Sequence, residues 1–266
     1  MLSLPKIGLG TWELSPSACK VSVLKALEIG YRLIDTAQLY KNEQAVGEAI
    51  TETSVPREDY ILATKLSMLN LSPAAVARTA EKSLQKLRTD YVDILYVHWP
   101  IITYNPKKTL PAIVKLVQAG KVRNIGVSNF TTHHLDVAIK TCSMPIAVNQ
   151  IEHHPLLQQR ILRDYQDQHD IVLVAYSPIG RGNLANVPEL HQVAKKYEVS
   201  IAQVALAWEM AHGAVPIPKA TSEGHLRDNF AAQDLVLDEE DLQLIDSIKV
   251  KKRFVNPPIV HPKWDE

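Results

Sequence analysis

Short apolar runs alternate with amphipathic segments along nearly the whole chain. An apolar run of roughly four to eight residues, bounded by turn residues, is typical of a buried parallel strand. Apolar residues at helical spacing, as in the segment 73–87, are typical of a helix that covers such a strand. This pattern predicts strands at residues 6–10, 32–35, 60–65, 91–98, 122–130, 145–152, 171–178 and 215–218.

Helices are predicted between consecutive strands and after the last one. Ser15 and Asn42 stand where N-terminal caps are expected, and Gly30 and Gly120 stand where helices are expected to end. The predicted helices cover residues 15–28, 43–50, 72–87, 109–119, 132–140, 158–168, 188–197, 200–211, 222–230 and 239–249.

This alternation decides the expected fold class. Strands that are separated by helices pair in parallel, and eight such strands close into a barrel. We therefore predict an α/β fold of the (β/α)8 TIM barrel class, with residues 1–266 as one domain. A doubly wound open sheet is the alternative. It is less favoured because the stretch GLGTWE at residues 8–13 lacks the third glycine of the dinucleotide-binding fingerprint.

Composition excludes several kinds of partner. Lysine and arginine together number 29, as do aspartate and glutamate, so no global field would hold nucleic acid. The start MLSLPKIGLG shows no basic leader, and no apolar stretch approaches the ~20 residues of a membrane helix. Cys19 and Cys142 follow no metal spacing and are interpreted as reduced thiols. We expect a monomeric, cytoplasmic protein that binds neither nucleic acid nor membrane.

Polar residues follow the ends of three consecutive predicted strands. Asp35 closes the second strand and Tyr40 follows it, while Lys65 closes the third strand and His98 the fourth. Each has an ordinary explanation when taken alone, as a turn aspartate, a surface lysine or a core histidine. In a parallel barrel, however, all strand ends open on one face, so these side chains would meet there. The sequence therefore predicts a site at that face.

Motifs along the chain resemble those of one known family. GYRLIDTAQLY, ATK, DILYVHWP, GVSNF, VNQIEHHP, AYSPIGRG and IPKA look like the successive signatures of the aldo-keto reductases. The resemblance covers nearly the whole chain and is nearest to small bacterial 2,5-diketo-gluconate and methylglyoxal reductases. It implies NADPH-dependent reduction of small aldehydes, ketones or α-keto compounds to alcohols. It also implies that the catalytic residues are Asp35, Tyr40, Lys65 and His98.

Elementary chemistry agrees with these roles. A carbonyl that accepts hydride becomes an alkoxide and needs a proton, but a phenol with a pKa of about 10 releases its proton poorly near neutral pH. We expect the ammonium of Lys65 to lower the pKa of Tyr40, and Asp35 to pair with that ammonium. A neutral His98 would donate a hydrogen bond to the substrate carbonyl. Tyr40 is then the general acid.

The resemblance also assigns residues to the cofactor. Ser128, Asn129 and Gln150 are expected to bind the nicotinamide carboxamide, because Asn and Gln offer an amide both a donor and an acceptor. Tyr176 would stack under the nicotinamide ring. The other implied cofactor positions are Gly10, Thr11, Trp12, Asp35, Ser177, Pro178, Ile179, Gly180, Arg181, Pro218, Lys219, Ala220, Thr221, Ser222, His225 and Asn229.

The expected adenosine end departs from the family pattern. Ala220 stands where the family often has serine, and His225 where it often has an arginine that meets the 2′-phosphate. A largely neutral histidine holds phosphate more weakly than a guanidinium does. Lys219 and the helix start near residue 222 still favour an anion. We expect NADPH to be preferred and NADH to be used measurably.

Substrate contacts are implied at the mouth of the barrel. They involve Trp12, Tyr40, His98 and Trp99. Short segments after residues 100 and 182 predict an uncapped, shallow mouth that suits small carbonyl substrates. At the opposite end, residues 1–5 predict no hairpin, so the closure of the barrel there is left open.

Two other functions compete with the reductase. A nicotinamide-sensing regulatory subunit would keep the fold but catalyse little, although the complete set of four site residues argues against it. A metal-dependent hydrolase could recruit His98, His153 and His154. Their positions do not form a ligand cage, so no metal is expected.

Overall fold

The centre of the molecule is a sheet of eight parallel strands. It is known from a computed structural model that describes residues 2–257 and 261–265. Neighbours in the sheet follow the chain order, and the amides of Gly8 and Gly10 donate to the carbonyls of Pro216 and Pro218, closing the ring. The predicted (β/α)8 barrel is confirmed. The strands are β1 (Leu9–Gly10), β2 (Leu33–Asp35), β3 (Ile61–Leu66), β4 (Val92–Val97), β5 (Val122–Ser128), β6 (Ile146–Glu152), β7 (Val172–Tyr176) and β8 (Val215–Pro216).

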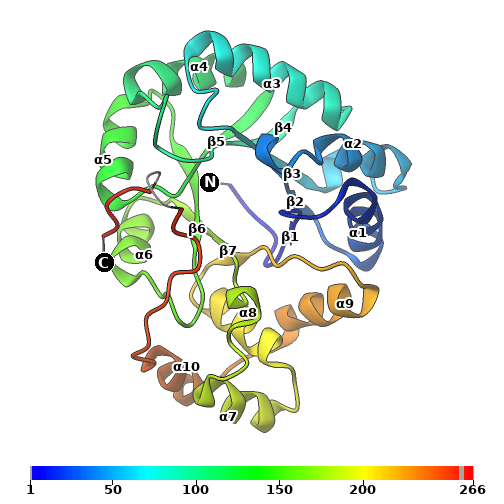
Figure 1. The fold of residues 1–266 in the computed structure, drawn as a ribbon, viewed down its shortest axis with the longest axis vertical. Helices are drawn as coiled ribbons and strands as arrows, with labels where there is room; N and C mark the ends of the chain where they lie inside the picture. Colours follow the sequence, from blue (N-terminus) through cyan, green and yellow to red (C-terminus); the bar gives the residue numbers. More distant parts are fainter. Residues whose placement is uncertain (1, 258–260, 266) are drawn as a thin grey trace.

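Helices surround the strands, and the last four lie together on one side of the ring (Figure 1). Each predicted helix is found, with ends that differ by a few residues. Among the described residues, no helix combines the length and apolar character needed to cross a bilayer. The helices are α1 (Pro16–Ile29), α2 (Glu43–Glu52), α3 (Pro73–Leu87), α4 (Pro106–Gln118), α5 (Thr132–Thr141), α6 (Arg160–Gln168), α7 (Pro188–Tyr197), α8 (Ile201–Ala211), α9 (Glu223–Ala231) and α10 (Glu239–Asp246).

The first and last strands are shorter than predicted. Residues 6–10 were expected to form a strand, but β1 contains only Leu9 and Gly10. Strand β8 likewise ends at Pro216. Pro216 and Pro218 have no amide hydrogen, so a regular ladder cannot continue along this part of the chain. The closure of the barrel therefore rests on a few backbone hydrogen bonds.

Apolar side chains close the end of the barrel where the strands begin. Inward-facing residues such as Leu33, Ile94 and Val148 form a buried cluster inside the ring of strands. Leu2 and Leu4 pack against this cluster. Figure 1 shows the N-terminal stretch running toward the centre of the ring. Leu2 and Leu4 therefore contribute to closing this end of the barrel.

Helix α2 packs closely on α3 through Gly47. A Cβ atom added to Gly47 would lie 2.1 Å from the carbonyl oxygen of Lys86. The cap expected at the start of α2 is wrong, because the side chain of Asn42 makes no hydrogen bond to the helix. Asn42 is buried and donates to the carbonyls of Thr11 (2.8 Å) and Leu14 (3.3 Å) instead. This ties the loop after β2 to the loop after β1.

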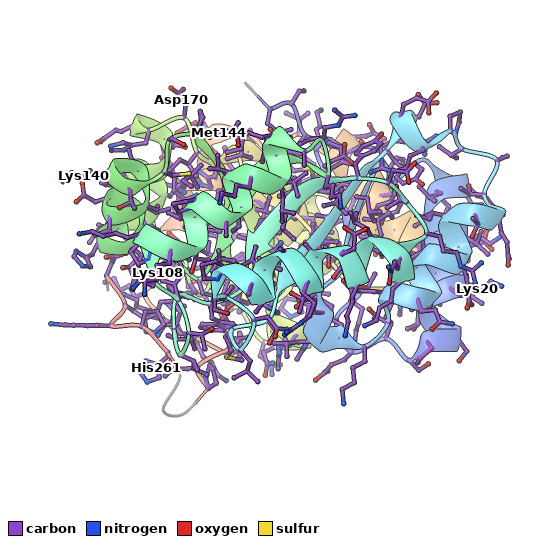
Figure 2. The ribbon with its side chains drawn as sticks, turned by 90° about the horizontal axis from the view of Figure 1, so that it is seen from above. Lys20, Lys108, Lys140, Met144, Asp170 and His261 are labelled. Carbon is purple, nitrogen blue, oxygen red and sulfur yellow. The ribbon has the colours of Figure 1, made fainter. Side chains whose placement is uncertain are left out.

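The chain after α10, residues 247–257 and 261–265, is called here the C-terminal segment. It runs from α10 past α6 toward α5 (Figure 1). In Figure 2, His261 lies at the edge opposite Met144 and Asp170, which precede β6 and β7. The C-terminal segment therefore lies on the face where the strands end, which is the face of the predicted site.

Candidate active site

Asp35 and Lys65 form a buried ion pair at the ends of β2 and β3. The Nζ atom of Lys65 donates to Asp35, to the carbonyl of Thr36 (3.0 Å) and to the hydroxyl of Tyr40 (3.2 Å). An ammonium has three protons, so these acceptors satisfy it. The side-chain amide of Gln150 donates to the second oxygen of Asp35 at 2.8 Å. Burial raises the pKa of Asp35 and lowers that of Lys65, and their mutual attraction opposes both shifts.

Tyr40 is carried by a short 3-10 helix, Gln38–Tyr40, in the loop after β2. The side-chain amide of Gln38 donates to the carbonyl of Thr79 (3.2 Å) and the hydroxyl of Ser83 (3.1 Å). Its carbonyl accepts from the amide of Ser67 at 3.0 Å. Gln38 thus fixes the turn that presents Tyr40. Sequence reasoning missed this residue, although an amide between the acid and the phenol of DTAQLY was a usable signal.

The proton on Tyr40 is held more firmly than the sequence predicted. Burial raises the pKa of Tyr40 well above 10, and the charge of Asp35 raises it further. The expectation of a lowered pKa for Tyr40 is therefore wrong as a net result, because the attraction of Lys65 for the phenolate does not outweigh burial and the charge of Asp35. Tyr40 therefore remains protonated, which is the state that a proton donor needs.

His98 lies beside Tyr40 at the end of β4. The two ring centroids are 5.7 Å apart at an angle of 77°. Burial lowers the pKa of His98 well below 6.5, and the charge of Lys65 lowers it further. The ring is therefore neutral at physiological pH, as predicted. Its Nδ1 atom is buried, and no partner for it lies among the described residues. The four predicted site residues are brought together.

The residues assigned to the nicotinamide form one hydrogen-bonded group. The hydroxyl of Ser128 donates to the carbonyl of Gln150 (2.9 Å), and the amide of Asn129 donates to that hydroxyl (3.1 Å) and to the carbonyl of His98 (3.1 Å). The hydroxyl of Tyr176 donates to the side-chain oxygen of Asn129 at 2.8 Å. One lone pair of that oxygen takes no part in these bonds and suits an amide donor of a ligand. Gln150 also touches Asp35, a contact that sequence reasoning did not anticipate.

The loops after β1 and β7 face each other across this end of the barrel. The guanidinium carbon of Arg181 lies 4.1 Å from the ring centroid of Trp12. The hydroxyl of Thr11 donates to the carbonyl of Asp35 at 2.9 Å. Gly10 permits a close approach, because a Cβ atom there would lie 2.6 Å from the carbonyl oxygen of Ile217. The remaining residues of the β7 loop are the half-buried Ser177 and Ile179 and the buried Pro178 and Gly180.

The residues assigned to the adenosine end surround the start of α9. The hydroxyl of Ser222 caps this helix and accepts from the amide of His225 at 3.2 Å. Glu223 lies in the same turn, where its carboxylate pairs with Arg227 at 2.7 Å. Lys25 lies 3.7 Å from the same carboxylate, so two cations offset its charge. Among the assigned residues, Lys219, Thr221, Ser222 and His225 are exposed, whereas Pro218, Ala220 and Asn229 are buried.

The mouth of the site is covered on the side of Trp99. Trp99 is only 7% exposed, and the ring of Trp264 contacts its edge with centroids 6.2 Å apart. The guanidinium carbon of Arg253 lies 3.8 Å from the ring centroid of Trp264. The predicted uncapped mouth is therefore wrong on this side. The C-terminal segment, which showed no periodic pattern, supplies the cover, while Trp12 remains 36% exposed.

The histidines after β6 have protein partners. The ring of His153 bonds to the carboxylate of Glu209 (2.5 Å) and to the carbonyl of Gln158 (2.9 Å). The Nε2 atom of His154 lies 3.1 Å from Glu152. Within the described part of the chain, no three His, Cys, Asp or Glu side chains are grouped as a metal site requires. His153 therefore links the end of β6 to α8, and His154 bonds back to the last residue of β6.

Comparison with known proteins identifies the family. Residues 6–250 match the sequence pattern of the aldo/keto reductase family. The chain belongs to this family. Aldo-keto reductases are oxidoreductases, so this protein is an enzyme of that class. The family assignment agrees with the group of Asp35, Tyr40, Lys65 and His98 at the ends of the strands.

Individual relatives align over nearly their full length. The methylglyoxal reductase DkgB of Escherichia coli O157:H7 is 39% identical over 267 residues, covering 99% of this chain and 100% of the relative. The 9,11-endoperoxide prostaglandin H2 reductase of Trypanosoma cruzi (strain CL Brener) is 40% identical over 262 residues, covering 96% and 91%. The solved structure of MGS-M4, an aldo-keto reductase from a Medee basin deep-sea metagenome library, is 36% identical with a TM-score of 0.93, covering 96% and 95%. Relatives of nearly equal identity thus carry different substrate names.

Proposed function

We propose that this aldo-keto reductase converts small aldehydes, ketones and α-keto compounds to alcohols with NADPH, and that Tyr40 supplies the proton. The observation that carries the proposal is the hydrogen-bonded series from Asp35 through Lys65 to Tyr40, beside the neutral ring of His98. The name of the E. coli relative supports methylglyoxal as a test substrate.

The nicotinamide, when bound, supplies hydride to the carbonyl carbon of the substrate. The hydroxyl of Tyr40 gives its proton to the carbonyl oxygen as that oxygen becomes an alkoxide. An alkoxide is a far stronger base than a phenolate, so the raised pKa of Tyr40 still permits the transfer. The ammonium of Lys65, 3.2 Å from the phenol oxygen, stabilises the phenolate that remains. His98 donates a hydrogen bond that orients the carbonyl.

The cofactor residues predicted from the sequence fit a nicotinamide dinucleotide. The group of Ser128, Asn129 and Tyr176 is held by hydrogen bonds beside His98, with acceptor capacity left on Asn129. At the other end, Lys219 and the amides that begin α9 favour a phosphate. The absence of an arginine at position 225 weakens that preference. We therefore propose that NADPH is preferred and that NADH also supports turnover.

The decisive experiment follows the absorbance of reduced nicotinamide. Purified protein with NADPH and methylglyoxal is expected to consume NADPH. Tyr40→Phe should reduce turnover by roughly 10²–10⁴ while NADPH binding, measured by fluorescence, is unchanged. Tyr60→Phe is the matched control, because Tyr60 is a buried phenol at the beginning of β3. Normal turnover by Tyr40→Phe would remove this residue from the mechanism.

Two further outcomes have definite meanings. Binding of NADPH without turnover of any carbonyl substrate would favour the nicotinamide-sensing regulatory subunit. A Michaelis constant for NADH below that for NADPH would overturn the cofactor preference, while leaving the proton donor in place.

A further inference from the structure

Strand β4 carries a buried phenol, Tyr96, that the proposed mechanism does not use. Tyr96 is 1% exposed and belongs to the cluster inside the ring of strands, together with Leu33, Ile94 and Val148. The other buried members of this cluster, as far as the chain is described, are aliphatic. Burying a hydroxyl costs free energy unless a partner compensates it, so a phenol at this place requires more than a packing explanation.

The neighbouring strand β5 leaves space for the ring of Tyr96. Gly126 pairs with Tyr96 across β4 and β5, and a Cβ atom on Gly126 would lie 2.5 Å from the Cδ1 atom of that ring. The backbone of Gly126 lies outside the left-handed region, so space rather than conformation requires a glycine here. The position of the ring is therefore fixed by its surroundings.

The ring of Tyr96 faces the ammonium of Lys65. The two residues pair across β3 and β4, and the Nζ atom of Lys65 lies 5.6 Å from the ring centroid of Tyr96. The same Nζ atom lies 4.9 Å from the ring centroid of Tyr40. Its protons are taken by Asp35, by the carbonyl of Thr36 and by the hydroxyl of Tyr40. Tyr96 therefore offers the ammonium the negative face of an aromatic ring, which attracts a cation at this distance.

The hydroxyl of Tyr96 is linked to the same ion pair through Gln150. Burial raises the pKa of Tyr96 well above 10, the charge of Asp35 raises it further, and a hydrogen bond from Gln150 opposes both. The side-chain amide of Gln150 also donates to Asp35 at 2.8 Å. An amide nitrogen carries two protons, so it can serve the phenol and the carboxylate together. Tyr96 thus contacts the lysine with its ring and the partner of Asp35 with its hydroxyl.

Lys65 needs this support because its surroundings exclude water. Burial lowers the pKa of Lys65, and the charge of Asp35 opposes that shift. The titratable groups that face the ammonium are Asp35 from β2, Tyr40 from the loop after β2, and Tyr96 and His98 from β4. In a desolvated site, the attraction between a cation and an aromatic face is stronger than in water. The ring of Tyr96 therefore adds to the attraction that keeps Lys65 charged.

We propose, on the basis of the function proposed above, that Tyr96 is a positioning residue whose ring keeps the ammonium of Lys65 charged and directed at the hydroxyl of Tyr40. The ammonium stabilises the phenolate that remains on Tyr40 after proton transfer. A weaker ring face at position 96 therefore lowers kcat and leaves the KM of the carbonyl substrate unchanged, because the lost interaction acts in the transition state.

The test weakens the ring face while its size stays nearly constant. Tyr96→Phe keeps the ring, and monofluorinated and trifluorinated phenylalanine at position 96 withdraw electrons from its face in steps. With NADPH and methylglyoxal, kcat should fall along this series, by about tenfold from Tyr96→Phe to the trifluorinated variant. The alkaline limb of the pH profile of kcat should move down by about one pH unit, because the charged form of Lys65 loses stabilisation.

The same series at position 31 is the matched control. Tyr31 is a fully buried phenol whose ring packs against Phe230 at a centroid distance of 4.9 Å. Fluorination there should change neither kcat nor the pH profile. An unchanged kcat along the series at position 96 would overturn the proposal, and so would a rise in KM at constant kcat.

Urea unfolding tests the attraction between Tyr96 and Lys65 without any turnover. Tyr96→Leu should raise the unfolding equilibrium constant about tenfold more in the wild type than in Asp35→Asn/Lys65→Met, which lacks the ion pair. Equal increases in both backgrounds would show that Tyr96 only packs in the core and would overturn the proposal. If the wild type reduces no carbonyl substrate, the proposed function fails, yet this measurement still decides the attraction. Turnover that is insensitive to fluorination at position 96 refutes the positioning role alone.

Discussion

Removing one charge of the Asp35–Lys65 pair should damage the fold far more than removing both. The side chains are 3% and 0% exposed, so solvent cannot screen a charge that loses its partner. In Lys65→Met, the carboxylate of Asp35 keeps only the hydrogen bond from Gln150. In Asp35→Asn, the ammonium keeps the carbonyl of Thr36 and the hydroxyl of Tyr40 but loses its counter-charge.

The size of the effect follows from this burial. Removing one partner of a buried ion pair costs about 3–5 kcal/mol, whereas replacing the whole pair is often nearly neutral. For a chain of this size, Lys65→Met should lower Tm by roughly 6–20 °C at about 2–4 °C per kcal/mol. The double variant Asp35→Asn/Lys65→Met should be no less stable than either single variant. The coupling energy in the cycle is then at least about 3 kcal/mol.

Urea unfolding of the wild type, both single variants and the double variant measures the cycle. The dependence of the unfolding free energy on urea concentration must be the same in the four proteins, so that differences in the urea midpoint report differences in stability. Additive losses, with the double variant less stable by the sum of the singles, would refute the reasoning, because the two charges would then be stabilised independently. Activity plays no part in this test, since all three variants lack a residue of the proposed mechanism.

Three further predictions concern other parts of the molecule. Gly47→Ala should lower the free energy of unfolding by about 1–3 kcal/mol, because the new Cβ meets the backbone of α3. Gly224→Ala in α9 is the control, because its new Cβ has open space and should not destabilise the protein. Equal Tm values for the two variants would contradict this. His225→Arg should lower the KM for NADPH about tenfold and leave that for NADH unchanged, as steady-state kinetics would show. Burial raises the pKa of Glu152, but hydrogen bonds from His154 and two amides outweigh burial and hold this pKa below 4.5. The ionised Glu152 therefore stabilises the fold fully above pH 4.5, and this contribution is lost as the pH falls through the folded pKa. Urea unfolding should therefore show the stability gap between wild type and Glu152→Gln shrinking below pH 4.5; a gap that widens on acidification would count against this account.

The barrel and the central group of residues could be predicted because both have local signals. Each strand is a short apolar run between turn residues, and each polar residue of the group stands at the end of one. Parallel pairing then brings Asp35, Lys65 and His98 to one face without further information. The family motifs contain the same residues, so pattern and resemblance led to the same positions.

What could not be predicted depends on contacts between distant residues. Glu152 holds amides 102 positions further along the chain, and nothing periodic marks the C-terminal segment that contains them. The pKa of Tyr40 depends on how completely the phenol is buried and on how Asp35 balances Lys65, which only coordinates reveal. Leu2 and Leu4, which pack against the cluster inside the barrel, stand in a stretch too short to show a strand or helix periodicity.

The proton machinery and the predicted cofactor groups come from different halves of the ring. Strands β2 to β4 end in the residues that hold and donate the proton, and β5 to β7 end in those assigned to the nicotinamide. Two hydrogen bonds join the halves at this point, from Gln150 to Asp35 and from Asn129 to the backbone of His98. Gln150 thus links the strands of the nicotinamide side to the carboxylate that holds Lys65, so a shift of one half against the other would change the orientation of that lysine.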